Sequence, residues 1–469
     1  MTATAAPTLD LHRPVVIGFG ITGRAVATAL VARGHTPLVL DDRATDDTRA
    51  AAADLGVELR QPSADAAEQR RDLEAALEGA TVMLPAPGLP AHHAAFAVAA
   101  ELEVPIASEF DLAGAWDERP LVAITGTNGK TTVTMMVTDA LRRSGLTTHA
   151  VGNTEVPLVA AIDDPDTDVF VVECSSFRLA HSLDFRPTVA AWLNFAPDHL
   201  DAHGSLEEYR DAKASIYHGL RHGGAAVVAH DDPVVAAAAP TRADLTVEHF
   251  GLETGDWRVA DGAVVGPEGP IVAVEDLVRS QPHDLRNATA AAAIARHAGA
   301  TIDGIAEMLR TFGGLPHRVQ LVAEHDGVRW FNDSKATVPH ATLAALGGFD
   351  SVVLIAGGRN KGLDLAVLAD GVPPVRAVVA TGDAADEVLA AFAGCGVETT
   401  TAASMIDAVS AAAAFAHAGD TVLLSPSCTS FDWYPNYGTR GDDFVRLVTD
   451  HIAASVAGAA DRSREAGTA

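Results

Sequence analysis

The sequence predicts an α/β protein of three domains: a Rossmann-like domain, a central P-loop-type domain and a second, C-terminal Rossmann-like domain. Apolar strands alternate with helical stretches along the chain, which is the pattern of βαβ units. Glycine-rich or polar clusters directly follow several strands, at the edge where open parallel sheets bind ligands. Because 469 residues exceed what one hydrophobic core holds, we expect domains at 1–118, 119–314 and 315–469.

The composition argues against several classes of function. The chain has 33 lysines and arginines against 62 aspartates and glutamates, a formal charge of −29, whereas nucleic acids and anionic membranes attract basic surfaces. No stretch approaches the ~18 to 20 consecutive apolar residues of a membrane span, and residues 1–14 do not resemble a signal peptide. The three widely spaced cysteines offer neither a disulfide framework nor a zinc spacing. We therefore expect a cytoplasmic protein without nucleic-acid or membrane partners.

The N-terminal domain opens with the pattern of a dinucleotide-binding βαβ unit. An apolar strand at 14–17 runs into GFGITG at 18–23, a G-x-G-x-x-G motif that opens a helix reaching Arg33. A second strand ends just before Asp41, where such units place an acid for a ribose hydroxyl about 20 residues after the glycines. Further strands are expected at 81–84 and 105–107, with a helix at 91–101. This pattern predicts a nucleotide site, with NAD as the first candidate.

A possible phosphate turn begins the central domain. The apolar strand 121–125 leads into GTNGKT at 126–131, which opens a helix. Glycine-rich turns and helix N-termini attract phosphate, Lys130 can reach terminal phosphates, and the Thr131 hydroxyl suits Mg²⁺. The common P-loop has four residues between its glycines, whereas here only two separate Gly126 from Gly129. The turn is therefore either a shortened phosphate loop or a strand–turn–helix corner with an incidental lysine.

Two side chains that suit Mg²⁺ follow later strands of this domain. Glu173 follows a strand at 168–172, and His199 follows a strand at 189–193. In a parallel sheet, both positions share an edge with the phosphate turn. A carboxylate and an imidazole beside phosphates form a reasonable Mg²⁺ shell, since this ion prefers oxygen ligands and retains waters. Taken singly, a salt-bridged glutamate and a helix-capping histidine are the simpler interpretations.

The rest of the central domain contributes one unusual lysine. A helix beginning at Ser205 carries Tyr209 and Lys213 one turn apart on one face, although a lysine on such a helix is ordinarily solvated. A strand at 225–229, irregular sequence and an alanine-rich helix at 287–297 follow. The glycines and proline of 313–316 then end the domain.

Polar clusters also follow the strands of the third domain. Strands are expected at 328–332, 351–356, 377–381 and 421–424, with helices after Pro339 and at 405–417. Residues 333–337, Lys361 and residues 425–432 follow three of these strands. In so acidic a chain, Lys335 and Lys361 at strand ends are as consistent with anion binding as with solubility.

Together these motifs resemble the Mur ligases of peptidoglycan synthesis over nearly the whole chain. The matching segments are 126–131 (GTNGKT), 173–177 (ECSSF), Asn194 with 198–199 (DH), Tyr209 with Lys213, 315–318 (LPHR) and 332–337 (NDSKAT). Residues 18–23, 332–337 and 424–432 (LSPSCTSFD) are most similar to the members that add D-glutamate. The resemblance also explains the short phosphate turn, which is this family's own loop.

The resemblance implies an ATP-dependent amide ligase that joins D-glutamate to UDP-N-acetylmuramoyl-L-alanine (UDP-MurNAc-L-Ala) through an acyl phosphate, in cytoplasmic peptidoglycan precursor synthesis. It implies ATP, two Mg²⁺ ions and a CO₂-derived carbamate on Lys213. A carboxylate must approach a triphosphate, so cations have to neutralise both groups. The carbamate would replace an ammonium that repels Mg²⁺ with an oxygen ligand. The two substrates would be the only partners, and we expect a monomer.

The resemblance also implies roles for individual residues. Catalytic roles would fall to Lys130, Glu173, His199 and Lys213. The metal ligands would be Thr131, Glu173, His199 and the Lys213 carbamate. ATP would contact, across the junction of the second and third domains, Gly126, Thr127, Asn128, Gly129, Lys130, Thr131, Thr132, Asn287, Arg318 and Asp333. The UDP-sugar, in place of NAD, would contact Ile21, Thr22, Asp41 and Asn153. D-glutamate would contact Lys335, Thr337, Lys361, Ser430 and Phe431, with the two lysines opposing its two carboxylates.

Three positions depart from the family pattern, and three other functions compete with it. Ala86 replaces a frequent serine, Asp284 an asparagine near adenine, and Tyr437 a phenylalanine near D-glutamate. An NAD-dependent oxidoreductase would explain the N-terminal motif but leave Glu173 and Lys213 without roles. A non-catalytic UDP-sugar sensor would not need an intact ATP site. A ligase for lysine or diaminopimelate would need a site for a cationic side chain, which a lysine at 361 opposes.

Overall fold

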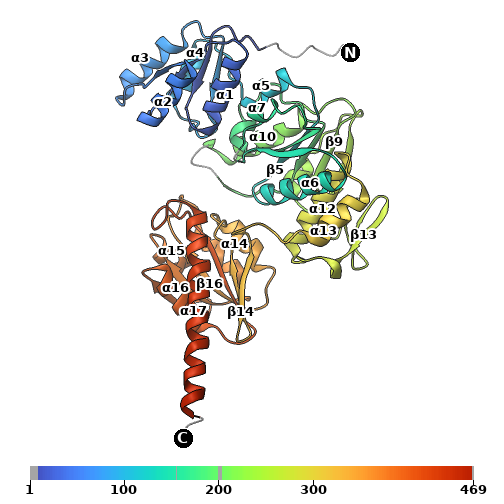
Figure 1. Ribbon diagram of the computed structural model, residues 1–469, viewed down its shortest axis with the longest axis vertical. Coiled ribbons are helices and arrows are strands. Elements are labelled where there is room, and N and C mark those ends of the chain that lie inside the picture. The colour runs from blue at the N-terminus through green and yellow to red at the C-terminus, as the bar shows by residue number, and fades with distance from the viewer. Residues whose placement is uncertain (1–8, 155, 199–202, 467–469) are drawn as a thin grey trace. The chain divides into compact units, whose positions relative to one another are not determined.

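The computed structural model describes residues 9–154, 156–198 and 203–466 (Figure 1). They form two compact units: the first reaches Phe312 but omits Arg279–Asp284, and the second combines that segment with the chain from Gly313 on. Across the described part of the chain, no helix has both the length and the apolar character needed to cross a membrane. The expected boundary at 314/315 lies next to the start of the second unit. The one at 118/119 separates two sheets of the first unit and stays a prediction.

The N-terminal part of the first unit is built on a parallel four-stranded sheet with the order β3-β2-β1-β4. Its strands are β1 (Pro14–Ile17), β2 (Leu38–Leu40), β3 (Glu58–Arg60) and β4 (Val82–Pro85). Its helices are α1 (Ile21–Ala32), α2 (Asp46–Leu55), α3 (Ala66–Leu77), α4 (Ala94–Glu101) and α5 (Glu109–Trp116). Capping boxes at Thr45 and Ser108 start α2 and α5, because each side chain satisfies backbone N–H groups of the first turn.

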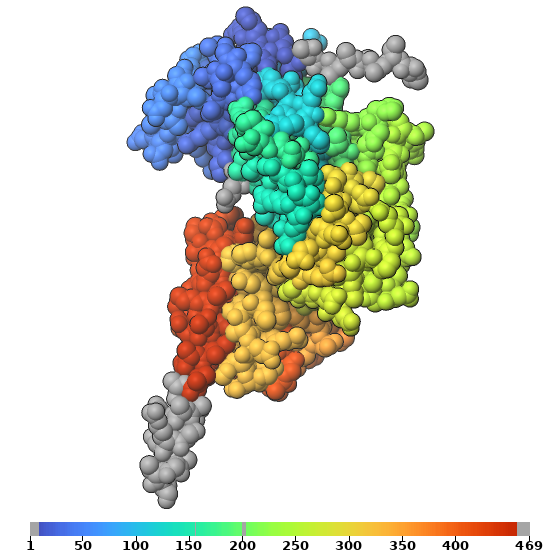
Figure 2. Space-filling view, turned by 45° about the vertical axis from the view of Figure 1, so that its right-hand side comes forward, coloured from blue at the N-terminus to red at the C-terminus, as the bar shows by residue number. Residues whose placement is uncertain are grey.

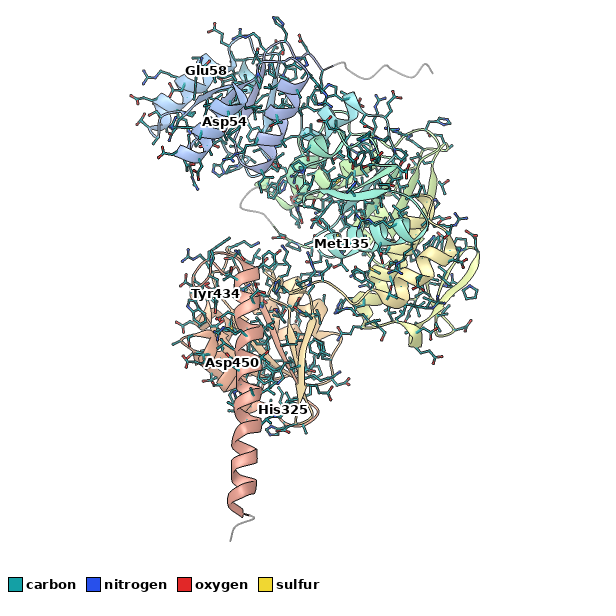
Figure 3. All side chains as sticks on the ribbon, in the orientation of Figure 1. Asp54, Glu58, Met135, His325, Tyr434 and Asp450 are labelled. Atoms are coloured by element: carbon teal, nitrogen blue, oxygen red, sulfur yellow. The ribbon has the colours of Figure 1, made fainter. Side chains whose placement is uncertain are left out.

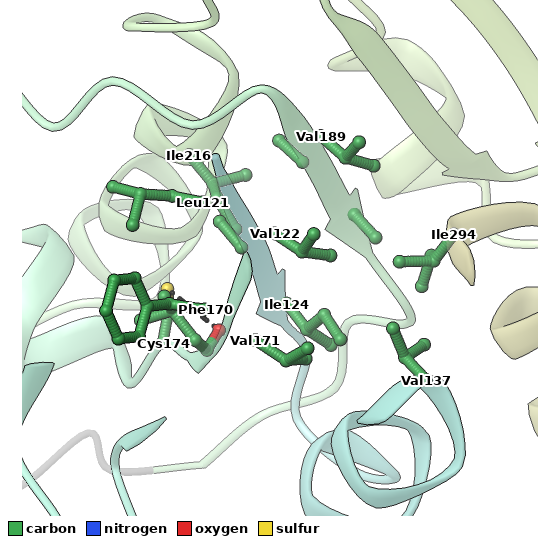
Figure 4. Close-up of a cluster of buried hydrophobic side chains, with 14 of the residues drawn as sticks. Leu121, Val122, Ile124, Val137, Phe170, Val171, Cys174, Val189, Ile216 and Ile294 are labelled. Carbon is green, nitrogen blue, oxygen red and sulfur yellow. Dashed lines mark hydrogen bonds between the residues drawn. The ribbon is translucent and has the colours of Figure 1, made fainter. Parts of the chain in front are cut away.

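A second sheet of the first unit has six parallel strands in the order β10-β9-β8-β5-β7-β6. The strands are β5 (Leu121–Thr125), β6 (Thr148–Gly152), β7 (Val169–Glu173), β8 (Val189–Trp192), β9 (Ala225–Ala229) and β10 (Thr246–Phe250). The helical segments along it are α6 (Lys130–Arg143), α7 (Leu158–Ala161), α8 (Ser176–Leu179), α10 (Leu206–Ala214), η1 (Ser215–Tyr217) and α11 (Pro233–Ala237). Figure 4 shows the apolar side chains of β5 packed against Val171 and Val189 of the neighbouring strands, and this burial of both faces is typical of parallel sheets.

The first unit ends with a small sheet and two helices. The antiparallel strands β11 (Arg258–Ala260), β12 (Ala263–Gly266) and β13 (Gly269–Ala273) lead through η2 (Val274–Asp276) to α12 (Pro282–His297) and α13 (Ile302–Thr311). The alanines of α12 are buried, and α13 packs beside α6, as Figure 2 shows on one face. Asn287 of α12 lies beside Gly129, the N-cap residue of α6.

The second unit contains a mixed six-stranded sheet in the order β14-β15-β19-β16-β17-β18, in which only the β14–β15 pair is antiparallel. The strands are β14 (Gln320–His325), β15 (Val328–Asn332), β16 (Val352–Gly357), β17 (Val375–Thr381), β18 (Glu398–Ala402) and β19 (Thr421–Ser427). One apolar cluster joins the sheet to α14 (Pro339–Leu346), η3 (Leu365–Gly371) and α15 (Ala385–Ala391). A separate cluster joins it to α16 (Met405–Phe415) and α17 (Tyr437–Ala466), so the sheet is covered on both faces.

The prediction of an α/β fold with parallel sheets is confirmed, and two local expectations are wrong. The strand expected at 105–107 is only an isolated bridge between Met83 and Ile106. The region after Ala229, expected to be irregular, contains α11 and the strands β10 to β13. The strands of the small sheet are mostly half-buried, so they show neither long apolar runs nor clear alternation.

Candidate active site

The phosphate turn joins the end of β5 to the start of α6. Gly129 is the N-cap of α6 and has a φ of +81°, in the left-handed region that favours glycine. A Cβ added at Gly129 would lie 2.8 Å from Oδ1 of Asn287. The Asn287 side chain therefore lies directly beside the turn. It is close to the N-terminus of α6, whose backbone N–H groups suit a phosphate.

The segment after β8 holds this short turn in shape. The Asn194 amide accepts from Asn128 N–H (2.8 Å) and donates to the Asn128 carbonyl (3.1 Å). The Thr127 hydroxyl donates to the Ala196 carbonyl (3.1 Å) and accepts from Ala196 N–H (3.0 Å). These reciprocal bonds from the segment after β8 hold the turn in its conformation. So short a turn has few residues that could form such bonds within it.

Two lysine side chains meet at one carbonyl oxygen of the turn. Lys130 Nζ lies 2.7 Å from the Gly126 oxygen, and Lys213 Nζ, from α10, lies 2.8 Å from the same atom. The two nitrogens are therefore no more than 5.5 Å apart, the sum of those distances. Lys130 also donates to the Thr127 carbonyl (3.0 Å). The structure thus brings two amine groups to the turn, one of them Lys130, whose side chain could reach bound phosphates.

Lys213 is unusual because it is buried, with 1% of its surface exposed. Its ammonium lies 4.5 Å from the centre of the Tyr209 ring, so the predicted shared face of Tyr209 and Lys213 is observed. Burial, and then the nearby Lys130 ammonium, lower the pKa of Lys213 well below its usual range, against a smaller opposing effect of Asp198. The neutral form of this amine is therefore far more populated than that of a surface lysine.

Glu173, the last residue of β7, is buried on the strand that pairs with β5, which leads into the phosphate turn. Its Oε1 accepts from the Asn153 side-chain amide at 2.9 Å, whereas its buried Oε2 has no hydrogen-bond partner among the residues that the structure describes. A buried, unpartnered carboxylate oxygen is costly unless a cation or donor satisfies it. This atom therefore fits the Mg²⁺ ligand predicted at Glu173.

The remaining predicted metal ligands are only partly described. His199 lies outside the residues that the structure describes. Thr131 follows Lys130 in the first turn of α6. Within the described ranges, histidine, cysteine, aspartate and glutamate side chains form no group of three or more that could hold a metal. A metal here would consequently depend on other oxygen donors, of which phosphate, water and a carbamate are the chemically suitable ones.

The G-x-G-x-x-G loop of the N-terminal sheet positions the predicted UDP-sugar residues. A Cβ on Gly23 would lie 1.9 Å from the Gly18 carbonyl oxygen, so α1 packs closely against the loop. Asp41 accepts from Phe19 N–H at 2.6 Å and thereby closes the loop. Ile21 is exposed and Thr22 is buried. The structure thus brings Ile21, Thr22 and Asp41 to one loop.

In the second unit, Asp333 is buried just after β15. Its carboxylate accepts from the Ser425 hydroxyl (2.8 Å) and Val319 N–H (3.2 Å). Burial raises the pKa of Asp333 to about 7, although these bonds and the nearby Arg318 oppose the rise. Arg318 and Asp333 therefore interact within this unit, whereas Asn287 belongs to the first.

The predicted D-glutamate residues follow three adjacent parallel strands, so they share one edge of the second unit's sheet. Lys335 and Thr337 follow β15, Lys361 follows β16, and Ser430 and Phe431 follow β19, with β15–β19 and β19–β16 paired in parallel. The Lys335 ammonium lies 3.8 Å from the centre of the Tyr437 ring. Ser430 is buried, while Phe431 is 61% exposed. The edge therefore combines cations with an exposed aromatic side chain.

Sequence analysis did not identify two buried arginines, Arg440 in the second unit and Arg178 in the first. Arg440 of α17 donates to the Ser334 hydroxyl (2.9 Å) and to the Ser334 (2.8 Å) and Cys428 (3.2 Å) carbonyls, which joins the loops after β15 and β19. Burial lowers the pKa of Arg440 to about 10. Tyr434, labelled in Figure 3, donates to Asp443 (2.6 Å) and ties the same region to α17. In the first unit, Arg178 of α8 likewise joins separate segments, because it donates to Glu109, Asn153 and Thr22. In the sequence, it is marked only by a charge directly after the ECSSF motif.

Comparison with known proteins identifies the family. Residues 124–295 match the Mur ligase middle domain, and residues 317–428 match the Mur ligase glutamate ligase domain. The UDP-N-acetylmuramoylalanine–D-glutamate ligase of Frankia casuarinae is 40% identical over 455 residues, covering 92% of this chain and 93% of that protein. The protein of the same name from Chromohalobacter salexigens is 35% identical over 462 residues, covering 96% and 100%.

Solved structures show the same fold. UDP-N-acetylmuramate-alanine ligase MurC from Thermotoga maritima superposes with a TM-score of 0.58 at 18% identity, covering 94% of this chain and 99% of that one. MurF ligase from the same organism, solved in complex with ADP, gives a TM-score of 0.56 at 16% identity, covering 96% and 98%. With relatives above 30% identity over nearly its whole length, the chain belongs to the Mur ligase family, among the UDP-N-acetylmuramoylalanine–D-glutamate ligases.

Proposed function

We propose that the chain is an ATP-dependent ligase that joins D-glutamate to UDP-MurNAc-L-Ala during peptidoglycan precursor synthesis. The carboxylate of the alanyl group attacks the γ-phosphorus of ATP, giving an acyl phosphate and ADP. The amine of D-glutamate then attacks the acyl carbon, and phosphate leaves as the amide forms. The observation that carries this proposal is the pair of lysines on the Gly126 carbonyl at the end of β5.

The first step brings a carboxylate toward a triphosphate, and these two anions repel each other. Positive charge at the turn would reduce that repulsion. Backbone N–H groups at the start of α6 would face the phosphates, and Gly129 at the N-cap would allow their close approach. Lys130, now bonded to two carbonyls of its own loop, would transfer its hydrogen bonds to phosphate oxygens. Contacts with the nucleoside are proposed for Asn287, which lies beside Gly129, and for Arg318 and Asp333.

The residues fit a resident Mg²⁺ near Glu173. The unpartnered Oε2 of Glu173 would be one ligand, with Thr131, His199 and a modified Lys213 as the others. Two Mg²⁺ ions are proposed in all. When bound, they would neutralise the charges of the phosphates and of the substrate carboxylate. Asn153 holds the opposite oxygen of Glu173 and so leaves Oε2 directed to the cation.

We also propose that Lys213 carries a carbamate. Its neutral amine attacks the carbon of CO₂, an N–C bond forms, and one proton is released to water. Burial and the Lys130 ammonium favour the neutral amine that this reaction needs. The product is an anion beside Lys130, which turns a repulsion between two ammonium groups into an attraction.

The other substrates would use the residues already grouped by the fold. Ile21, Thr22, Asp41 and Asn153 would contact the UDP-sugar. The five residues at the β15–β19–β16 edge would bind D-glutamate, with Lys335 and Lys361 on its two carboxylates and the remaining contacts from Thr337, Ser430 and Phe431. We further propose that the chain acts in the cytoplasm as a monomer, which light scattering after gel filtration tests.

Phosphate release from ATP in the presence of UDP-MurNAc-L-Ala tests the proposed function. We expect release to depend on D-glutamate and to stay at background with L-glutamate, lysine or diaminopimelate. Release that ignored D-glutamate would reject the assignment. Release driven by lysine or diaminopimelate would move the chain to another branch of the same reaction class.

A further inference from the structure

Arg178, in helix α8, is a buried arginine that contacts three distant parts of the first unit. Its guanidinium donates to Glu109 Oε1 (3.1 Å), Asn153 Oδ1 (3.0 Å) and Thr22 Oγ1 (3.0 Å). Only 6% of its surface is exposed. Glu109 is equally buried, and its second oxygen accepts from Val159 N–H at 2.9 Å. The arginine is therefore held in one geometry from several sides.

The contact with Asn153 decides how that side-chain amide is oriented. A guanidinium has donors and no acceptor, so the Asn153 oxygen has to face Arg178. The amide nitrogen of Asn153 then faces Glu173, where it donates to Oε1 at 2.9 Å. With the opposite orientation, the Asn153 oxygen would face the Glu173 carboxylate, and two acceptors would repel each other. The Arg178 contact consequently makes the amide nitrogen of Asn153, and not its oxygen, face the Glu173 carboxylate, where it donates to Oε1.

We propose that Arg178 is a positioning residue: it fixes the Asn153 amide, and through it directs the unpartnered Oε2 of Glu173 toward the cation. The same guanidinium holds Thr22 of the N-terminal loop, so one side chain links the UDP-sugar loop to the metal ligand. This inference rests on the proposed function for the identity of the cation and the sugar nucleotide. The network Glu109–Arg178–Asn153–Glu173 corresponds physically to an outer shell that orients a metal ligand.

The experiment compares Mn²⁺ binding, with Mn²⁺ alone as the probe and the free ion measured by electron paramagnetic resonance. Arg178→Lys keeps the buried charge opposite Glu109 but lacks the planar fork needed to reach three acceptors. The double variant Glu109→Gln/Arg178→Met removes both buried charges together, a change that proteins often tolerate. Arg119→Met is the matched control, because Arg119 pairs with Asp117 and backbone carbonyls of the same unit away from this network.

We expect both Arg178 variants to be folded, with a cooperative thermal unfolding transition. They should bind Mn²⁺ about 10- to 100-fold more weakly than the parent. Their KM for UDP-MurNAc-L-Ala should also rise, because Thr22 loses its donor. Arg119→Met should bind Mn²⁺ as the parent does, whatever its melting temperature. A merely structural role predicts the opposite pattern for Arg178→Lys, with a lower melting temperature and unchanged Mn²⁺ affinity.

Folded Arg178 variants that bind Mn²⁺ as tightly as the parent would overturn the inference. Glu173→Gln serves as the reference for loss of the ligand itself, and unchanged Mn²⁺ binding in that variant would overturn the metal role of Glu173 and the inference together. Failure of the proposed function is distinguishable from both, because it appears as phosphate release by the parent chain that does not depend on D-glutamate.

Discussion

Replacing Gly129 with alanine tests whether the phosphate turn and Asn287 act together. Alanine at a φ of +81° costs about 1–2 kcal/mol, and its Cβ would lie 2.8 Å from the Asn287 Oδ1 atom, inside van der Waals contact. Because that oxygen ends a flexible side chain, Asn287 has to rotate away. We expect the unfolding free energy of the first unit to fall by about 1–2 kcal/mol. Loss of one hydrogen bond to ATP, about 0.5–1.5 kcal/mol, should weaken ATP binding about 2- to 12-fold.

Gly145→Ala is the matched control for this substitution. Gly145 follows the other end of α6 with a φ of +87°, and nothing lies within 4 Å of a Cβ built there. It therefore has the same backbone cost without the contact to Asn287. Urea unfolding measures the first effect, and titration calorimetry with a non-hydrolysable ATP analogue measures the second.

We expect the two variants to differ in ATP affinity and to show similar losses of unfolding free energy. Adding Asn287→Ala to Gly129→Ala should weaken ATP binding little further, because Asn287 is already displaced. Equal ATP affinities for Gly129→Ala and Gly145→Ala would refute the proposed contact between Asn287 and the nucleotide.

Three further substitutions address the other parts of the site. Lys213→Ala should lose most D-glutamate-dependent phosphate release and regain part of it with added acetate, whose carboxylate would replace the proposed carbamate; full activity without acetate would exclude that role. Burial raises the pKa of Asp333 from its ordinary 3.8 to about 7, so between those pH values the folded state retains a proton that the unfolded chain has released. The unfolding free energy of the second unit should therefore fall as pH rises from about 4 to 7, by about 4 kcal/mol at 1.36 kcal/mol per pH unit. Asp333→Asn should flatten that part of the curve, and equal slopes for parent and variant in urea titrations would contradict the assigned cause. Lys361→Ala should raise the KM for D-glutamate about 10- to 150-fold, the effect of losing a charged hydrogen bond of about 1.5–3 kcal/mol. Its KM for ATP should stay within about twofold, and an unchanged KM for D-glutamate would exclude Lys361 from that site.

The buried strands could be predicted from the sequence because both of their faces are apolar. Leu121–Thr125 and Val352–Gly357 are buried at every position, so they appear as unbroken runs of β-branched and small residues. Several of the strands missed are exposed or half-buried, as at Glu58–Arg60 and Glu398–Ala402. Such strands exist because a neighbour supplies the hydrogen bonds, which no local pattern records.

The polar clusters after strands were predictable for a related reason. In parallel sheets, chain order alone sends Gly126 and Glu173 to one edge, and the same rule groups Lys335 with Lys361 in the other unit. Arg178 was not predictable, because its partners Thr22 and Glu109 lie 156 and 69 residues earlier in the chain. Its role follows from the packing of three elements, and sequence spacing contains no trace of that packing.

Two lysines contact one backbone oxygen of the short turn. The loop has only two residues between its glycines, and the Lys130 ammonium donates to two of its carbonyls, those of Gly126 and Thr127. Lys213 approaches the same Gly126 oxygen from α10, and in the charged form it would repel Lys130 in a buried environment. Losing that charge relieves the repulsion, and gaining a carbamate reverses it. The burial of Lys213 would therefore favour the proposed carbamate, which would couple this lysine electrostatically to Lys130 of the phosphate turn.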